Sequence, residues 1–554
     1  MAMKPQNSVC DYISQTLREN WEREALTDFK GQSFQYRAVA RKIAKLHIMF
    51  EHAGIRKGDR IALVGRNSAQ WSIALLATIT YGAVAVPLLN DFKPDTIHHL
   101  MNHSGARLAF MDGTTEENTD ADSMKYLEGI LHIADYSLAM SRNEGLSYAR
   151  GHLNELFGKK YPERFSPADV RFAPVSPDDV MLINYTSGST GFSKGVMLTE
   201  RAIWSNLQFC WDGLDFLDPG DELICMLPLA HMFGLMVEML HPLVKGCHVN
   251  FLTRTPSPKI IMAAFSEIRP KLIVAVPLII EKIIRTRVFP MLEKPLMKIL
   301  MHVPYVDDHL FARIKERIID TFGGNVVEMI IGGAALNKEV EDLLRRIHFP
   351  FTVGYGMTEC GPLISYCPWR SQKEGSCGRI VDRMEARVDS PDPEHTPGVL
   401  WVRGDNVMKG YFKNPEATDA VMHDGWLNTG DICTMDPENY LFIRGRDKNM
   451  ILGPSGQNIY PEEIEQQLNN MPYVAESIVI DAGGGRLEAL IHPDFDTAEK
   501  LAMTDAQIEQ QMRDNIRQLN TELPAYSKIQ DLRIFQDEFE KTPKRSIKRY
   551  LYMK

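Results

Sequence analysis

Short apolar runs alternate with amphipathic stretches along the first part of the chain. Residues 33–54 carry apolar side chains at helical spacing and end at Gly54, which predicts a helix with a glycine C-cap. Residues 61–64 form a short apolar run, a second helical stretch ends at Gly82, and residues 83–89 form another apolar run. This alternation predicts a parallel or mixed sheet with helices on its faces.

The alternation resumes after a less regular, charge-rich region at 113–175. Two short strands are expected at 181–185 and 196–198, and Thr199 suits the N-cap of the helix that follows. Further strand-like runs continue the α/β pattern, at residues 107–111, 223–229, 247–253, 272–276 and 326–333. The chain is therefore expected to be an α/β protein.

The pattern changes in the last third of the chain. From about residue 380 to 447, short strands separated by Pro and Gly turns predict a small β-barrel-like subdomain. Beyond it, Pro461 fits a first helical position, and strands flank a long charged helix near 504–521. We expect a large N-terminal domain at 1–447 and a small, mobile α+β domain at 448–554.

Length and composition agree with a multidomain globular protein. The chain has 554 residues, of which 44% are hydrophobic and 24% charged. A net charge of −10 argues against a general nucleic-acid binder. Eight scattered cysteines without a CxxC pair indicate a reducing compartment. No signal peptide and no long apolar run are found, so a cytoplasmic protein is expected, and peripheral membrane contact stays open.

The segment Tyr185–Gly195, YTSGSTGFSKG, concentrates glycine, serine and threonine around a single lysine. Backbone N–H groups, hydroxyls and one cation are suited to bind a polyphosphate. The segment is not a Walker A loop, because Ser193 precedes Lys194 and Gly195 follows it. A flexible polar linker is the alternative, but close apolar flanks on both sides disfavour it.

Two further segments carry polar groups directly after predicted strands. GGAAL at 332–336 begins with a glycine pair that lets backbone approach a ligand at the carboxyl end of a strand. In the segment at 351–366, Tyr355 offers an aromatic face for a base, Thr358 a hydroxyl for phosphate, and Glu359 a carboxylate for a metal. Taken alone, either segment could also be a simple turn.

These segments together resemble the adenylate-forming superfamily, which includes acyl-CoA synthetases, aryl-CoA ligases, luciferases and peptide-synthetase adenylation domains. YTSGSTGFSKG is similar to the family's phosphate loop, with Ser193 where proline is usual. GGAAL, GYGMTE, NTGD and GRDKN follow in the family's order. The resemblance extends from about residue 20 to the end of the chain.

The resemblance implies roles for individual residues. ATP, Mg²⁺ and CoA are the implied cofactors; Glu359 would hold the metal, Asp431 the ribose hydroxyls, and Lys448 would be the hinge between the domains. The implied nucleotide-binding residues are Thr186, Ser187, Gly188, Ser189, Thr190, Gly191, Lys194, Gly333, Ala334, Ala335, Tyr355, Gly356, Met357, Thr358, Asp431, Ile443 and Arg446.

The acyl substrate is indicated by two stretches. LPLAHMFGLMVEML at 227–240 resembles the helix that lines the family's acyl tunnel, and His231 would lie near the carboxylate and the thiol path. GMTECGPLISY is most similar to fatty acyl-CoA synthetases. We therefore expect a medium- to long-chain fatty acid. No carrier-protein segment follows the small domain, so free CoA is the expected acceptor.

The C-terminus departs from the family pattern. A catalytic lysine usually ends this motif, but alignment from Thr542 places Ser546 at its position. Lys544 and Lys548 lie two residues to either side, and residues two apart share a face of an extended segment. We favour Lys548 for the carboxylate and the α-phosphate. Substitution by Arg545 and weak adenylation stay open.

The leading hypothesis is an ATP-dependent acid–thiol ligase that activates a fatty acid as acyl-AMP and transfers it to CoA. The alternatives are an aryl-acid or acyl-carrier-protein ligase of the same mechanism, and a non-catalytic nucleotide-binding homologue. Ser546 motivates the last alternative. The phosphate loop, Glu359, Asp431 and Arg446 argue against it, since binding alone does not require them all.

Overall fold

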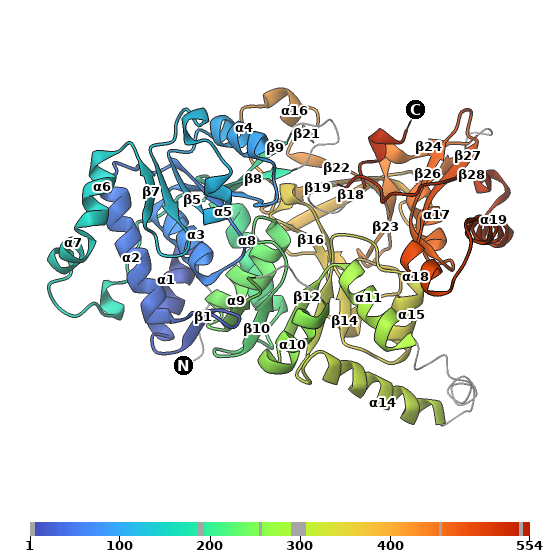
Figure 1. The fold of residues 1–554 in the computed structure, drawn as a ribbon, viewed down its shortest axis with the longest axis horizontal. Helices are drawn as coiled ribbons and strands as arrows, with labels where there is room; N and C mark the ends of the chain where they lie inside the picture. Colours follow the sequence, from blue (N-terminus) through green and yellow to red (C-terminus); the bar gives the residue numbers. More distant parts are fainter. Residues whose placement is uncertain are drawn as a thin grey trace.

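An eight-stranded sheet organises the N-terminal part of the molecule (Figure 1). The computed structural model describes residues 6–186, 193–253, 258–289, 306–453, 457–541 and 547–553. The inner strands are parallel, and β7, β9 and β20 run antiparallel to their neighbours. In sheet order the strands are β20 (Gly410–Tyr411), β9 (Lys194–Thr199), β8 (Val180–Thr186), β4 (Val84–Leu88), β3 (Arg60–Val64), β5 (Leu108–Met111), β6 (Gly129–His132) and β7 (Leu138–Ser141).

The helices between these strands begin and end at the residues that the sequence indicates. Helix α3 (Ala69–Tyr81) starts after Ser68, whose side chain accepts from the Trp71 N–H, and ends at Gly82 with φ of 85°. The helix expected from residue 33 begins later, as α2 (Tyr36–His52), because Ser33–Gln35 forms strand β2 against β1. The other helices of this part are α1 (Val9–Glu19), α4 (Pro94–Ser104), α5 (Gly113–Glu117), α6 (Glu144–Gly151), α7 (Leu153–Lys160) and α8 (Glu200–Gly213).

Two smaller sheets continue the α/β fold. The first has four strands: β10 (Glu222–Cys225), β11 (His248–Phe251), β1 (Glu24–Asp28) and β2. The second is fully parallel, so the carboxyl ends of its strands lie at one edge. Its strands are β12 (Leu272–Ala275), β13 (Glu328–Ile331) and β14 (Phe351–Val353), and its helices are α10 (Pro258–Ile268), α11 (Pro277–Arg287), α14 (Val306–Thr321) and α15 (Lys338–Arg346).

The β-rich segment forms antiparallel sheets. A three-stranded sheet joins β15 (Tyr355–Gly356), β16 (Leu363–Tyr366) and β17 (Arg379–Ile380), and a five-stranded sheet follows. Strand β20 (Gly410–Tyr411), which lies within the segment predicted to be β-barrel-like, does not join this sheet and pairs with β9 of the large sheet instead. The five strands are β18 (Met384–Asp389), β19 (Gly398–Gly404), β21 (Met422–His423), β22 (Trp426–Met435) and β23 (Leu441–Arg446); helix α16 (Pro415–Asp419) precedes β21.

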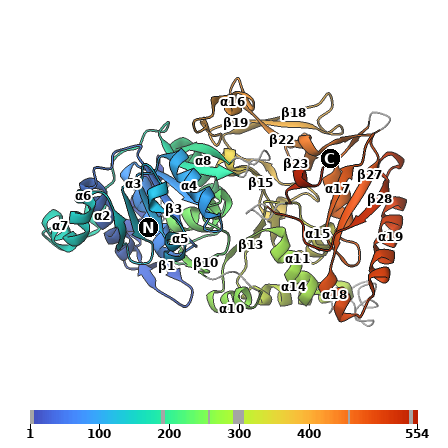
Figure 2. The same ribbon diagram turned by 45° about the horizontal axis from the view of Figure 1, so that its top comes forward.

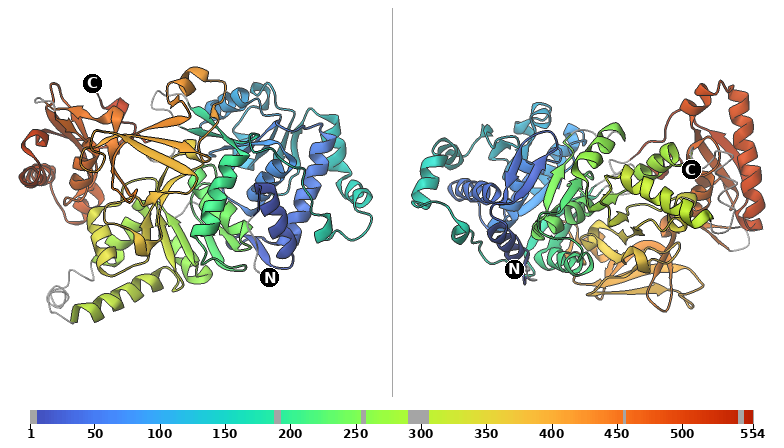
Figure 3. Two further views of the ribbon diagram at one scale, coloured as in Figure 1. Left: turned by 180° about the vertical axis from the view of Figure 1, so that it is seen from behind. Right: turned by 90° about the horizontal axis from the view of Figure 1, so that it is seen from below.

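A small α+β domain completes the chain at the end opposite to α6 and α7 (Figures 2 and 3). It touches the larger domain where Gln466 Nε2 donates to the Leu336 carbonyl at 2.7 Å, and where Asn337 and Asn470 are hydrogen-bonded. No described helix is both long and apolar enough to cross a membrane. The elements of the small domain are β24 (Ile451–Leu452), β25 (Asn458–Ile459), α17 (Pro461–Leu468), β26 (Val474–Asp481), β27 (Leu487–Pro493), α18 (Phe495–Lys500), α19 (Asp505–Glu522) and β28 (Ile529–Ile534).

Candidate active site

The candidate site begins at the carboxyl ends of β13 and β14, where the backbone of two strands comes very close. A Cβ on Gly332 would lie 3.1 Å from the Phe233 ring and 3.3 Å from the Gly354 carbonyl oxygen. One on Gly356 would lie 2.1 Å from the Pro362 oxygen. Glycine is therefore required at position 356, and a larger residue at 332 would fit only tightly. The edge of a parallel sheet is where α/β proteins bind ligands.

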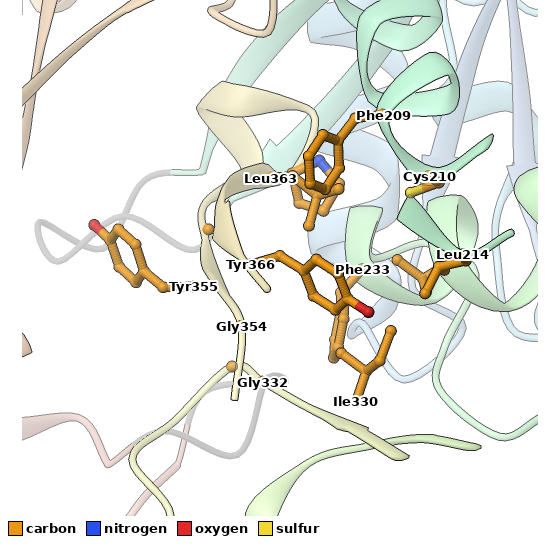
Figure 4. A pocket seen from close by; sticks show the side chains of 14 residues that line it. Phe209, Cys210, Leu214, Phe233, Ile330, Gly332, Gly354, Tyr355, Leu363 and Tyr366 are labelled. Carbon is orange, nitrogen blue, oxygen red and sulfur yellow. The ribbon is translucent and has the colours of Figure 1, made fainter. Parts of the chain in front are cut away.

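Tyr355, Asp431 and Arg446 form one connected polar group. Asp431 and Arg446 are directly opposite in the β22–β23 ladder, so their side chains leave the same face of the sheet. Arg446 Nε donates to Asp431 Oδ1 at 2.7 Å, and the Tyr355 hydroxyl donates to the other carboxylate oxygen. In Figure 4, Tyr355 points away from Phe233 and Tyr366. The sequence prediction that these three residues share a site is consistent with this placement.

The Asp431 carboxylate is 5% exposed, and its ionisation depends on its neighbours. Burial raises the pKa of Asp431, while the Arg446 guanidinium and the Tyr355 hydroxyl act in the opposite direction. Without these partners a buried carboxylate would favour the protonated form. The arrangement thus holds a hydrogen-bond acceptor at the edge of the site.

The phosphate-loop prediction is only partly within the described residues. Ser187, Gly188, Ser189, Thr190 and Gly191 lie outside them. The ends of the loop are described: Thr186 and Lys194 are partners in the β8–β9 ladder. The loop therefore begins and ends at one point of the large sheet.

Lys194 and Glu359 both contact the side chain of Tyr411. The Lys194 ammonium lies 4.8 Å from the centroid of the Tyr411 ring, and the Tyr411 hydroxyl donates to Glu359 Oε1 at 2.9 Å. Glu359 is 9% exposed, and it follows Thr358 in a short 3₁₀ turn, Thr358–Cys360. The structure thus brings together the predicted phosphate cation and the predicted metal ligand.

The residues at this point fit Mg²⁺ held mainly by a nucleotide. Mg²⁺ commonly binds through one or two carboxylates, substrate phosphates and water, not through an all-protein cage. Within the described residues, no group of three or more His, Cys, Asp or Glu side chains is placed to hold a metal. Glu359 supplies a carboxylate that shares the contact with Tyr411 with Lys194, and a carboxylate that accepts one hydrogen bond keeps further acceptor capacity.

A small apolar cavity lies beside the glycine edge. Figure 4 shows aromatic and aliphatic side chains gathered around it, and no charged residue is among its described walls. Tyr366 is fixed there by donating to Glu328 Oε1 at 3.0 Å. The side chains that line it are Phe209, Cys210, Leu214, Phe233, Val237, Ile330, Tyr355, Pro362, Leu363 and Tyr366.

The predicted acyl helix has an unusual form. Gly234–Leu240 is a π-helix, a conformation that occurs mostly as short pieces near functional sites. It presents Val237 to the cavity and follows His231, which is half-buried at the preceding turn. Glu238, on the same helix, accepts the Leu227 N–H at 2.8 Å and the Met226 N–H at 3.1 Å. This carboxylate therefore fixes the strand end that leads to His231.

The other predicted residues lie on several separate elements. Gly333, Ala334 and Ala335 form an exposed edge after β13, Met357 precedes the 3₁₀ turn, and Ile443 lies on β23. Lys448 lies in the 3₁₀ turn Asp447–Asn449 between the two domains. Lys548 pairs with Glu540 at 3.1 Å within the small domain, and Lys544 lies outside the described residues.

Comparison with known proteins identifies the family. The model of the AMP-binding enzyme family matches residues 13–412, and the model of its C-terminal domain matches residues 448–554. The chain belongs to the AMP-binding enzyme family. The resemblance stated from the sequence motifs is therefore confirmed.

Individual relatives cover most of this AMP-binding enzyme. It is 28% identical to 4-coumarate-CoA ligase 1 of Narcissus pseudonarcissus over 85% of this chain and 80% of that protein. It is 30% identical to the long-chain-fatty-acid–CoA ligase of Yersinia pestis over 77% of this chain and 74% of that protein. The o-succinylbenzoate CoA synthetase of Bacillus subtilis, solved with its acyl-adenylate, has a TM-score of 0.74 at 20% identity over 99% and 98% of the two chains. The expected fold is confirmed.

Sequence reasoning missed residues that come from distant segments. Phe209 on α8, Leu214 directly after it, and Ile330 on β13 line the cavity although no motif marks them. Tyr411 was given no role from the sequence, yet it contacts both Lys194 and Glu359. The Gly-Tyr pair before a run of turn formers was its only signal.

Proposed function

We propose that this AMP-binding enzyme is an ATP-dependent acid–thiol ligase that converts a fatty acid of medium to long chain into its CoA thioester. The reaction passes through acyl-AMP and releases AMP and pyrophosphate. The proposal rests on one observation. An apolar cavity lies beside an acceptor suited to ribose hydroxyls, a cation suited to phosphate and a carboxylate suited to a metal. ATP, Mg²⁺ and CoA are the cofactors of this chemistry.

The residues would divide the work of the first half-reaction. Two anions must meet when a carboxylate attacks the α-phosphate of ATP, so oriented donors and cations are needed. Lys194 and the phosphate loop would bind the leaving phosphates, and Thr358 would contact the α-phosphate. Asp431 would accept from the ribose hydroxyls, with Arg446 beside it. Bound Mg²⁺ would supply charge neutralisation at Glu359.

The second half-reaction needs a path for the thiol and a second arrangement of the domains. His231 lies at the turn before the cavity helix and would face the carboxylate and the thiol. Lys548 would serve adenylation after leaving Glu540, and Lys448 would be the hinge. The reaction ends when the thiol displaces AMP from the acyl carbon.

The apolar lining of the cavity favours the hydrocarbon chain of a fatty acid. The cavity volume is about 70 Å³, below the roughly 300–1,000 Å³ of typical ligand pockets, so its walls must shift to admit a substrate. A methylene chain is apolar along its whole length, which matches walls without a charged residue. An aryl acid is the second candidate, favoured by the aromatic walls Phe209, Phe233 and Tyr366, and relatives of both kinds support either choice.

The test is AMP release with a panel of acids, with and without CoA. Octanoate, dodecanoate and hexadecanoate are expected to cause AMP release, and this release should increase when CoA is added. The acids 4-coumarate and benzoate should cause little AMP release. AMP release that requires an aromatic acid would replace the fatty-acyl proposal with the aryl one. AMP release with none of the acids would contradict the ligase proposal itself.

A further inference from the structure

Tyr411 contacts two oppositely charged groups through different parts of one side chain. Its ring faces the Lys194 ammonium at 4.8 Å from the centroid, and its hydroxyl donates to Glu359 Oε1 at 2.9 Å. Tyr411 is 7% exposed, so both contacts are largely shielded from water. A cation over an aromatic face and a carboxylate beside a phenol hydroxyl are both favourable contacts.

Without a residue between them, these groups would attract each other. A direct pair between Lys194 and Glu359 would direct the ammonium away from phosphate and the carboxylate away from a metal. An aromatic face attracts a cation but leaves its three N–H donors able to reach other acceptors. The hydroxyl likewise occupies only part of the acceptor capacity of the carboxylate.

We propose that Tyr411 is a positioning residue that keeps Lys194 and Glu359 apart and directs both toward Mg²⁺–ATP. The inference rests on the phosphate and metal roles proposed above for these two residues. Tyr411 contacts neither the acid nor the reacting atoms in this account. It acts by fixing where the two charges lie.

The backbone around Tyr411 is built to fix this side chain. The Tyr411 N–H donates to Thr418 Oγ1 at 2.9 Å, and the Met408 N–H donates to the Glu359 carbonyl at 2.8 Å. Gly410 has φ of 137°, a region that favours glycine, and a Cβ there would lie 2.9 Å from Thr418. Strand β20 thereby leaves the neighbouring β-rich sheet and pairs with β9, the strand that begins at Lys194.

Tyr440 offers a matched control for a tyrosine that is only structural. Its hydroxyl donates to the Ser371 carbonyl at 2.6 Å, and the Lys373 ammonium lies 4.4 Å from its ring centroid. Tyr440 is 2% exposed, close to the value for Tyr411. It has the same kinds of contact but touches none of the residues assigned to ATP or metal.

The test measures binding of Mn²⁺ and of a non-hydrolysable ATP analogue by electron paramagnetic resonance and calorimetry. Tyr411→Phe retains the ring and removes the hydroxyl, so the Mn²⁺ affinity of the analogue complex is expected to fall roughly tenfold. The affinity for the metal-free analogue should stay unchanged. Tyr411→Leu also removes the face for Lys194, and metal-free analogue binding should then weaken as well. Tyr440→Phe should change neither affinity.

The Glu359→Gln variant distinguishes failure of the inference about Tyr411 from failure of the metal role proposed for Glu359. If Glu359→Gln weakens Mn²⁺ binding while Tyr411→Phe binds Mn²⁺ as the unmodified protein does, Tyr411 does not position the site and the inference is overturned. If Glu359→Gln also leaves Mn²⁺ binding unchanged, the metal role of Glu359 fails, and the inference fails with it. Thermal unfolding of Tyr411→Phe near that of Tyr440→Phe confirms that the fold is intact.

Discussion

Asp431 and Arg446 show how a single cross-strand pair shapes the end of the site proposed to bind the nucleotide. Register places them opposite each other, Arg446 donates to Asp431, and Tyr355 donates to the second oxygen. The carboxylate is buried, so its acceptor function depends on these donors. The hydrogen bonding of this carboxylate thus results from the pairing of two strands that lie far from the phosphate loop in the sequence.

Arg446→Ala is expected to raise the KM for ATP strongly. The buried Asp431 would lose its cation, its pKa would rise, and the protonated carboxyl group would accept less well from ribose. Asp431 is buried but the Arg446 side chain is 48% exposed, so water screens part of the interaction and the expected loss in kcat/KM is about tenfold. The measurement is steady-state kinetics over a range of ATP concentrations.

Arg403→Ala is the matched control for that substitution. Arg403 and Glu385 are opposite each other in the same sheet and form an exposed ion pair at 2.7 Å. Because exposed pairs contribute little, the KM for ATP should stay unchanged. Equal effects of the two substitutions would indicate a general disturbance of the sheet and would count against the assigned role of Arg446.

At the scale of elements, local pattern predicted most strands and helices, and long-range pairing decided the rest. Helix α3 carries its own start and stop in Ser68 and Gly82, so it could be placed from sequence. The pairing of β20 with β9 could not, because nothing near Tyr411 specifies a partner more than 200 residues away. The π-helix at 234–240 has the same apolar pattern as an α-helix, so only the structure separates them.

The residues of the candidate site likewise divide into those that local sequence marks and those that only tertiary packing brings together. Motif residues such as Thr358 and Glu359 could be found because they are adjacent in the chain, and Asp431 and Arg446 because they belong to segments that resemble motifs of the family. The cavity walls could not be found, since Phe209 on α8 meets Ile330 on β13 only through tertiary packing. Apolar residues in a cavity and in a core look alike in sequence.

Glu238 on the π-helix should make stability depend on pH. Burial raises the pKa of Glu238 to about 8, although the N–H groups of Leu227 and Met226 act to lower it. The unfolded chain releases this proton near pH 4.5, so between that value and about 8 only the folded state retains it. Stability therefore falls as pH rises through this window, by at most about 1.4 kcal/mol per pH unit.

Glu238→Gln removes this titration but keeps an acceptor for the two N–H groups. The thermal unfolding temperature of the Gln variant minus that of the unmodified protein should increase as pH rises from 5 toward 8. A parallel pH profile for both proteins would show that Glu238 is not protonated in the folded state. Melting curves recorded at several pH values provide this comparison.

At the scale of the whole molecule, the two domains meet beside the glycine edge. Gln466 donates to the Leu336 carbonyl, and Asn470 is hydrogen-bonded to Asn337, directly after GGAAL. Lys548 is paired with Glu540 in the same arrangement. A rotation of the small domain would have to break the first two contacts before Lys548 could serve adenylation.

Locking this arrangement should separate the two half-reactions. The variant Asn337→Cys, Asn470→Cys, joined by a short reducible thiol crosslinker, is expected to lose one half-reaction by at least about tenfold while it retains the other, and reduction should restore both. The single variants treated in the same way are the controls. The Asn337→Cys single variant also shows the effect of removing the N-cap of α15. Full rates of both steps in the locked protein would contradict domain rotation.

The most direct test of the account follows the oxygen atoms of the acid. When a carboxylate attacks the α-phosphate, one of its oxygens becomes the bridge of acyl-AMP and leaves with AMP when the thiol attacks the acyl carbon. Dodecanoate labelled with ¹⁸O in both carboxylate oxygens should therefore give AMP with a single ¹⁸O, unlabelled pyrophosphate and a thioester that keeps the other label. Mass spectrometry of the products measures this transfer. Unlabelled AMP, or label recovered in inorganic phosphate together with ADP, would contradict the account.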